Sequence, residues 1–170
     1  MFDFVGLIKD LAVLSKDIGH SDNDRRFYRM SGIKSLEEVL TNLLSAKVPA
    51  IGVEDSLEGR LLDNSSDGIF DRQYCVFYVF GRAGFLNHTQ REEEKRGIKA
   101  IAMKFVVKLR QMHLSDYNVQ TNHGLRGLDV NSFSYRTIAP LPEGLIALAV
   151  SFVVDRPFQT KLNPEDWDNS

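Results

Sequence analysis

The sequence has few of the residues that most often mark a chemical site. Its 170 residues include one cysteine, which rules out an intrachain disulfide. Cys75 lies within a run of aromatic and aliphatic residues, so we interpret it as a small buried hydrophobe rather than a nucleophile. The net charge of −2 lacks the basic excess with which proteins displace counterions from phosphates, and this disfavours nucleic-acid sequence recognition.

Long hydrophobic runs are also absent. No apolar run approaches the roughly 18 residues that cross a bilayer, so we expect no membrane association. The apolar N-terminus does not follow the pattern of a secretory signal, because Asp3 precedes any basic residue and Lys9 and Asp10 interrupt the run. Together with the single cysteine, these features predict a cytosolic site of synthesis.

What is present is the composition of an ordinary globular domain, with 43% hydrophobic and 26% charged residues. The length suits one hydrophobic core, so we expect a single α+β domain over residues 1–156 and a C-terminal arm over residues 157–170. In the arm, Phe158, Leu162 and Trp167 are spaced too widely for a strand or one helical stripe. They either pack on the chain's own core or anchor another subunit.

The periodicity of apolar residues predicts three helices and four strands. The helices are expected over residues 2–18, 35–44 and 89–113. The second and third helices begin at capping boxes, Ser35 with Glu38 and Thr89 with Glu92. The strands are expected at residues 48–55, 73–81, 132–138 and 145–154. The predicted order is therefore helix, helix, strand, strand, helix, strand, strand.

The predicted strand at residues 73–81 is apolar on both faces. Such a strand is usually central in its sheet, covered by helices on one side and by another layer or a neighbouring subunit on the other. Three polar stretches between the elements are expected as loops, at residues 19–32, 55–71 and 115–131. The last is long for an unstructured connection, which indicates function or mobility.

Candidate chemical sites in the sequence are incomplete. The run of residues 63–68, DNSSDG, copies the first half of a calcium loop, but its twelfth position is Tyr74 where a glutamate is needed. This favours an Asx-rich turn over a cation site. The four histidines are scattered and lack the spacing of zinc ligands, which indicates surface or loop positions. Neither a nucleophile elbow nor a phosphate-binding glycine loop occurs.

One run of acidic residues could in principle hold a general acid and base. Its members are Glu54, Asp55, Glu58, Asp63, Asp67 and Asp71. Runs of this kind more often form a solvated loop. Nothing in the spacing of these residues indicates that two of the carboxylates meet in a pocket.

The order of elements and three segments resemble the small tail-completion proteins of tailed bacteriophages and prophages, a group of tail terminator-like and minor tail proteins. The segments are residues 48–80, the Glu-rich start of the long helix, and residues 124–158. The resemblance implies a mixed or antiparallel four-stranded sheet with helices packed on one face. The polar segment at residues 19–32 and the extended C-terminal arm depart from the family pattern and leave the mode of assembly open.

The resemblance also implies a structural protein of the virion tail rather than an enzyme, made in the bacterial cytoplasm and working without a cofactor or metal. Its implied partners are itself, as a homo-oligomeric ring with six subunits as the expected number, and other tail or head-tail connector proteins. We expect subunit contacts in residues 61–71, 115–131 and 157–167. The candidate interaction residues are Asp63, Asp67, Asp71, Arg126, Asp129, Phe158, Leu162 and Trp167.

Two hypotheses of other classes stay open. In the first, the chain is a monomeric, non-catalytic adaptor or ligand-binding domain, and the loop at residues 115–131 closes over a small molecule in a deep apolar pocket. In the second, the chain is a hydrolase that uses two carboxylates of the acidic run at residues 54–71. The second hypothesis requires that two of these side chains face each other across a cleft.

Overall fold

A computed structural model describes residues 2–30, 41, 47–55, 58–63, 68–84, 87–118, 121–138, 141 and 144–158. The predicted second helix, apart from Thr41, lies outside these residues. So does the predicted C-terminal arm beyond Phe158.

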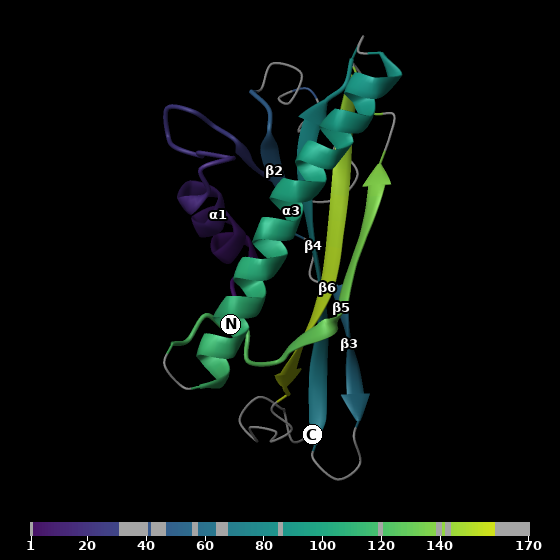
Figure 1. The fold of residues 1–170 in the computed structure, drawn as a ribbon. Coiled ribbons are helices and arrows are strands. Elements are labelled where there is room, and N and C mark those ends of the chain that lie inside the picture. Colours follow the sequence, from purple (N-terminus) through teal and green to yellow (C-terminus); the bar gives the residue numbers. More distant parts are fainter. Residues whose placement is uncertain are drawn as a thin grey trace, which may run out of the picture.

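The described chain is built on a six-stranded mixed sheet (Figure 1). Its strands are β1 (Phe27–Met30), β2 (Ala50–Glu54), β3 (Glu58–Asp63), β4 (Ile69–Arg82), β5 (Leu128–Ile138) and β6 (Leu145–Pro157). The strands follow the order β1-β2-β4-β6-β5, and β3 pairs with β4 outside this path. Among the described strands, β1 and β2 are parallel neighbours and the other neighbouring pairs are antiparallel.

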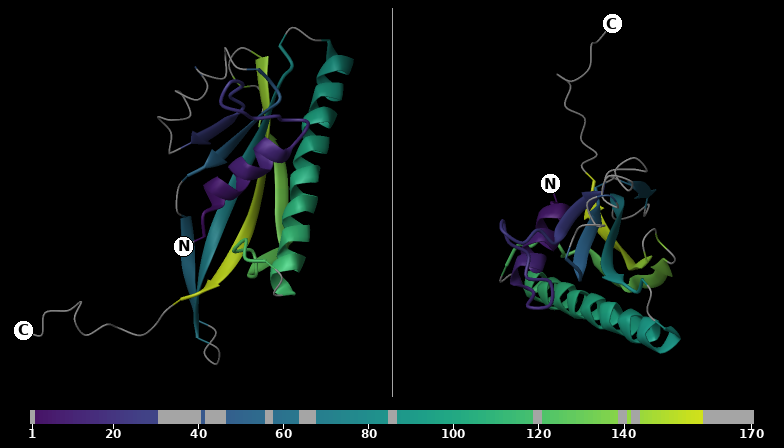
Figure 2. Two further views of the ribbon diagram at one scale, coloured as in Figure 1. Left: turned by 90° about the vertical axis from the view of Figure 1, so that its left-hand side faces the viewer. Right: turned by 90° about the horizontal axis from the view of Figure 1, so that it is seen from above.

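Two described helices, α1 (Phe4–Leu14) and α3 (His88–Tyr117), pack on the same face of this sheet (Figure 2). They close one hydrophobic core, in which the rings of Phe77 from β4 and Phe105 from α3 lie 5.9 Å apart. The sequence correctly predicted α1, α3, β2, β4 and β6, as well as the α+β class. The apolar residues of these elements recur at a regular spacing along the sequence, so the elements can be recognised without the tertiary structure.

The predicted four-stranded sheet is wrong, because β1 and β3 add two strands. β1 was expected as part of a polar loop; it has only four residues, too few for a clear alternating pattern. β3 was expected as a turn, because most of its side chains are exposed on both faces. Backbone pairing with β4, from Glu58 opposite Tyr74 to Asp63 opposite Ile69, holds β3 in place.

The N-terminal cap of α3 is also a correction. The cap is Asn87, whose side chain accepts a hydrogen bond from the N–H of Gln90 at 3.0 Å, while the Gln90 side chain accepts one from the N–H of Asn87 at 3.2 Å. The predicted box of Thr89 and Glu92 lies inside the first turns instead. Glu92 is thereby left to accept a hydrogen bond from Lys95 at 2.7 Å.

The predicted loop at residues 115–131 is shorter than expected, since α3 continues to Tyr117 and β5 begins at Leu128. The early part of β5 escaped prediction because its register on β6 shifts between Asp129 and Ser134. Ser132 bridges this irregularity: its hydroxyl donates to the Asp129 carbonyl at 2.6 Å and accepts from the N–H of Val153 at 2.9 Å. A shift of this kind interrupts the alternation of side chains.

The predicted burial of Cys75 is confirmed, and it has a chemical consequence. The side chain lies in the core, and desolvation raises the pKa of its thiol to about 12. Because the thiolate is the reactive form, we expect almost no labelling by Ellman's reagent in the native protein and one equivalent per chain in denaturant. Rapid stoichiometric labelling of the folded protein would contradict this assignment.

Candidate functional site

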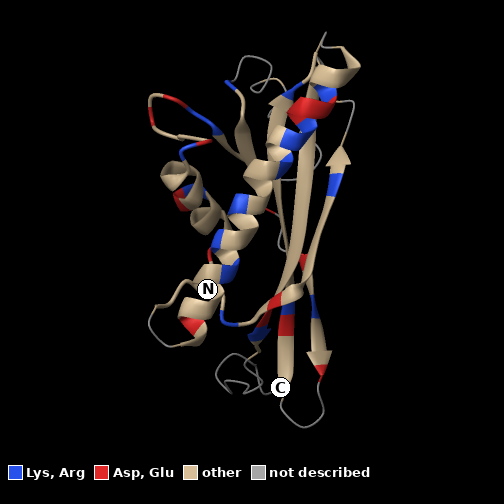
Figure 3. Cartoon of the chain, viewed as in Figure 1, with Lys and Arg blue, Asp and Glu red and all other residues tan. Residues whose placement is uncertain are grey.

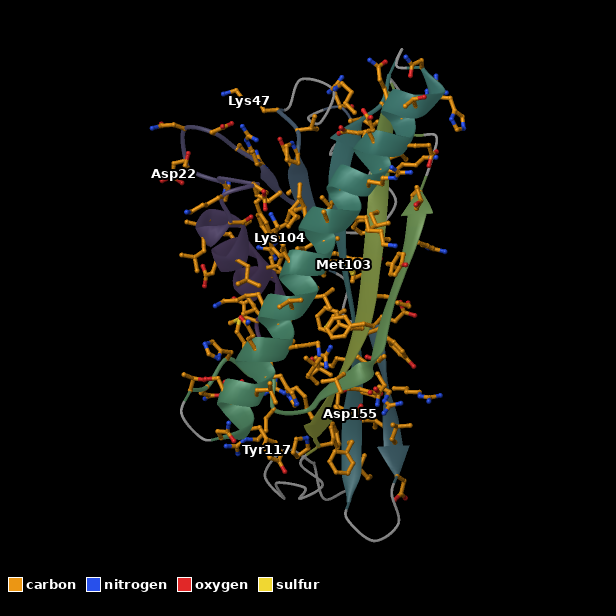
Figure 4. All side chains as sticks on the ribbon, in the orientation of Figure 1. Asp22, Lys47, Met103, Lys104, Tyr117 and Asp155 are labelled. Carbon is orange, nitrogen blue, oxygen red and sulfur yellow. The ribbon has the colours of Figure 1, made fainter. Side chains whose placement is uncertain are left out.

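The candidate interaction residues within the described chain gather at one end of the molecule. We call this the distal end and define it as residues 61–63, 69–73, 116–118, 121–129 and 154–158. Backbone hydrogen bonds tie it together: the N–H of Phe158 donates to the Ile69 carbonyl at 2.8 Å, and that of Asp155 donates to the Gly127 carbonyl at 2.8 Å. Figure 4 shows Asp155 and Tyr117 near this end.

The candidates Asp63, Asp71, Arg126, Asp129 and Phe158 all belong to the distal end. Asp63 ends β3, and Asp71 lies in β4, where its carboxylate accepts a hydrogen bond from the Gln73 side chain at 2.8 Å. Phe158 follows β6 and is 47% exposed. The other three candidates, Asp67, Leu162 and Trp167, lie outside the described residues. Three segments distant in the sequence therefore meet, as a shared contact surface would require.

An ion pair that the sequence did not reveal crosses the middle of the distal end. The Arg72 guanidinium on β4 donates to both carboxylate oxygens of Asp155 on β6, at 2.7 Å from Nε and 2.6 Å from Nη2. The hydrogen bond to Asp155 raises the pKa of Arg72, and the charge of Asp129 adds to the effect. The candidate Asp129 thus acts within a group of charges around Arg72. A two-point pair of this geometry fixes both side chains.

A buried carboxylate shapes the loop after α3. Asp116 is 2% exposed and accepts hydrogen bonds from the N–H groups of His123 and Leu125, both at 2.8 Å. The Thr121 hydroxyl donates to the same carboxylate at 3.0 Å, and His123 Nδ1 lies 2.8 Å from it. Burial acts to raise the pKa of Asp116, but these hydrogen bonds outweigh it, and the pKa lies below its usual range.

Sequence reasoning missed Asp116, although one signal was available. A carboxylate in the last turn of a helix opposes the helix dipole, so its presence there indicates a specific partner. The candidate Arg126 depends on the same turn, since its Nε donates to the Asp116 carbonyl at 3.4 Å.

A polar groove of about 610 Å³ opens beside this loop. It is lined by Asp116, Thr121, Asn122, Gly124, Arg126, Gly127, Asp155, Arg156 and Pro157. Its walls differ from the deep apolar pocket that the ligand-binding hypothesis requires, because they are mostly polar or charged. The Arg156 guanidinium also lies 5.8 Å from the centre of the Phe2 ring. This cation–π contact shields part of the charge of Arg156 from the groove.

Part of the acidic run does meet at a groove, contrary to the expectation of a solvated loop. Glu54, Asp55 and Glu58 line a space of about 240 Å³ together with Asp3, and Phe2, Tyr74 and Cys75 are among its other lining residues. Three of these carboxylates already bind the chain's own donors. The Asp3 carboxylate caps α1 by accepting from the N–H of Gly6 at 2.8 Å, Glu54 accepts from the Tyr78 hydroxyl at 3.2 Å, and Asp55 pairs with Arg29.

The predicted surface or loop positions of the histidines are confirmed in outline, since His88 is exposed, His20 and His123 lie in loops, and none of the four is buried. The three histidines other than His88 have local structural partners. His113 Nδ1 lies 2.8 Å from the Leu125 carbonyl, His20 accepts from the N–H of Arg26 at 3.2 Å, and His123 binds Asp116. Within the described residues, no three His, Cys, Asp or Glu side chains are placed to hold a metal ion. The middle of the calcium-like run, residues 64–67, lies outside the described chain.

The sheet also presents a surface on the side away from α1 and α3. We call this surface the open face and define it as Tyr74, Val76, Ser134, Ser151 and Val153, which lie on neighbouring positions of β4, β6 and β5. Tyr74 is 38% exposed, Ser134 is exposed, and the other three are half-buried. The hydroxyls of Ser134 and Ser151 lie 2.8 Å apart across the strands. Apart from Tyr74, the side chains of the open face are small, and the surface is partly apolar.

A second hydrophobic cluster lies on the same side of the sheet, further toward β1. Its buried members are Tyr28, Met30, Ala50, Phe80, Leu145 and Ala147. Successive side chains of β4 and β6 point to opposite faces of the sheet, which separates the two hydrophobic clusters. Phe77 and Val150 point to α3, while Tyr78 and Ala149 point away from it. Burial of the Tyr78 ring raises the pKa of its hydroxyl to about 12, and the hydrogen bond to Glu54 adds to this.

No family model matches the sequence, and no curated protein matches it significantly. In the part of the chain that the structure describes, neither helix combines the length and the apolarity needed to cross a membrane.

Proposed function

We propose that the chain is a structural subunit of a bacteriophage or prophage tail, of the tail terminator or head-tail completion type. It acts through self-association and through contacts with other tail proteins. The family resemblance of the sequence supplies the kind of assembly. The observation that carries the proposal is the open face, which leaves small and apolar side chains of β4 and β6 accessible beside the edge strand β5.

The edge of the sheet supports this proposal. β5 lies at the end of the strand order, so one side of its backbone has no neighbouring strand within the described sheet. Its last five residues, SYRTI, contain no proline and one charge, Arg136. Such an edge is a template for pairing with another chain unless the structure protects it. Closed rings of identical subunits use contacts of this kind, because each subunit offers one surface to the next.

The distal end supports contacts with other tail proteins. Its segments come from β3, β4, the loop after α3 and the end of β6, and they are tied by the Arg72–Asp155 pair and the Asp116 network. A surface that is already ordered loses less conformational entropy when it binds. Acidic and basic groups alternate on it, which suits recognition by charge rather than by a deep pocket.

Molar mass measured by light scattering tests the proposal directly. We expect the full chain to elute as a discrete oligomer, with rings visible by electron microscopy. Ser151→Lys should lower the molar mass to that of the monomer at the same concentration, because a lysine in the middle of the open face would block the approach of a second subunit.

Ala100→Lys is the matched control, since it places the same residue at an exposed position of α3 on the other side of the sheet. It should leave the molar mass unchanged. A full chain that is monomeric throughout the accessible concentration range would contradict self-association. If the Ser151→Lys variant and the native chain had equal molar masses, the contact between subunits would lie outside the open face.

A further inference from the structure

A separate groove lies where the C-terminal end of α1 meets the middle of α3. Its volume is about 430 Å³, and its lining residues are Leu11, Leu14, Ser15, Lys16, Asp17, Lys104, Phe105 and Lys108. Leu11 and Phe105 are buried and form an apolar floor, whereas Leu14 is 74% exposed at its wall. An exposed leucine beside a preformed apolar floor is a surface that another apolar group can cover. We call this the lysine groove; Figure 4 labels Lys104 beside it.

The rim of the lysine groove is positively charged. Lys104 binds the Asp17 carboxylate at 2.7 Å, while Lys16 and Lys108 have no ion pair or hydrogen bond with the described residues. The rest of α3 adds to the positive electrostatic potential at the groove. Between residues 95 and 113 its sequence contains six lysines and arginines and no acidic residue. Figure 3 shows these basic positions along α3. The groove therefore matches a segment with acidic residues around an apolar anchor.

The C-terminal residues of the chain have that chemistry. Residues 159–170, QTKLNPEDWDNS, follow Phe158 in the sequence. They place the indole of Trp167 among Glu165, Asp166 and Asp168, with Leu162 five residues before it. Tryptophan supplies a large apolar area and attracts cations to its face. Carboxylates on both sides of it complement Lys16 and Lys108.

We propose that residues 162–168 of one copy of the chain bind in the lysine groove of a second copy. Trp167 then covers the floor of Leu11 and Phe105, and the acidic residues face Lys16 and Lys108. This inference rests on the proposed self-association. The direction of the chain favours a second copy over the same one, because β6 ends at the distal end while the groove lies near the C-terminal end of α1 (Figure 1). An arm from one end and a groove elsewhere make a head-to-tail contact.

Trp167 is the single tryptophan of the chain, so intrinsic fluorescence reports on this residue alone. In the oligomeric full chain we expect blue-shifted emission and weak quenching by iodide. The double variant Lys16→Glu, Lys108→Glu should shift the emission to the red and increase iodide quenching several-fold, because its groove repels the acidic segment. The matched control is Arg96→Glu, Arg110→Glu. It makes the same charge change at exposed positions of α3 that do not line the groove, and it should leave the emission as in the native chain.

Mixing two variants distinguishes binding to a second copy from binding within one chain. The Lys16→Glu, Lys108→Glu chain carries the only tryptophan, and a Trp167→Phe chain in excess provides intact grooves without fluorescence. We expect the blue-shifted emission to return on mixing. An unchanged red emission after mixing would overturn the proposal, and so would a native oligomer whose Trp167 is fully accessible to iodide.

Failure of this inference is separable from failure of the proposed function. An oligomer by light scattering with an accessible Trp167 would overturn arm binding and leave self-association intact. A native chain that is monomeric by light scattering would overturn both, since no second copy would then be bound.

Discussion

Asp116→Ala is expected to lower the free energy of unfolding by about 3 kcal/mol, because it leaves several donors without an acceptor. These donors are the N–H groups of His123 and Leu125 and the hydroxyl of Thr121, which all point at the Asp116 carboxylate. Leu125 is fully buried, so its N–H has no contact with solvent in the native fold that could take the place of the lost acceptor. Urea denaturation measures the loss. Hydrogen exchange should also show faster exchange at residues 121–125 than in the native protein.

The effect of Asp116→Ala is expected to depend on pH. The folded-state pKa of Asp116 is lowered, so its ionised form contributes stability above the pKa of an unfolded aspartate, about 3.9. That contribution is lost as the pH falls through the lower folded-state value. The difference in stability between native chain and variant should therefore shrink in strong acid. An equal difference at neutral and strongly acidic pH would contradict the assignment of an ionised carboxylate.

Gly127→Ala is expected to be the most damaging small substitution at the distal end. A Cβ atom at this position would lie 1.7 Å from the carbonyl oxygen of Asp155 and 2.8 Å from its carbonyl carbon. Both are backbone atoms of β6, so no side-chain rotation relieves the clash. The strands must separate, which breaks the hydrogen bond from Asp155 to Gly127 and moves Asp155 away from Arg72. We expect a loss of more than about 3 kcal/mol or a failure to accumulate as soluble protein.

The control for Gly127→Ala is the same substitution at Gly97, inside α3. An added Cβ there meets no heavy atom within 4 Å. Alanine also restricts the unfolded chain and favours helix, so Gly97→Ala should raise the free energy of unfolding by about 0.5–1 kcal/mol. Thermal or urea unfolding measures the stability of both variants relative to the native chain. Native-like stability of Gly127→Ala would show that β5 and β6 are less closely apposed than the structure indicates.

The fold was predictable wherever burial repeats at a local period. The apolar positions of α3, including Ile98, Phe105 and Leu109, follow the helical repeat and identify the main helix directly. The apolar residues on both faces of β4 predicted a central strand, and β4 does pair with both β2 and β6. β3 could not be found in this way, because its side chains are mostly exposed and pairing with β4 decides its conformation.

The sequence predicted which residues belong to the candidate site, but it did not predict the contacts that hold the site together. The five candidates that the structure describes do meet at the distal end, although their predicted role as subunit contacts stays a prediction. The pair that ties this end together, Arg72 and Asp155, spans 83 residues of sequence, and neither residue stands out from its neighbours in the chain. Asp116 is different, since its partners follow within nine residues and its place at a helix end is anomalous.

By itself the sequence determined the α+β class, the long amphipathic helix, the apolar central strands and the burial of the single cysteine. These properties depend on neighbouring residues along one element, and hydrophobic periodicity records them. Only the tertiary structure decided the two extra strands, the open face, the distal end and the lysine groove. Each of these is made by segments far apart in the chain, and their hydrogen bonds, ion pairs and shared surfaces arise only when the chain has folded.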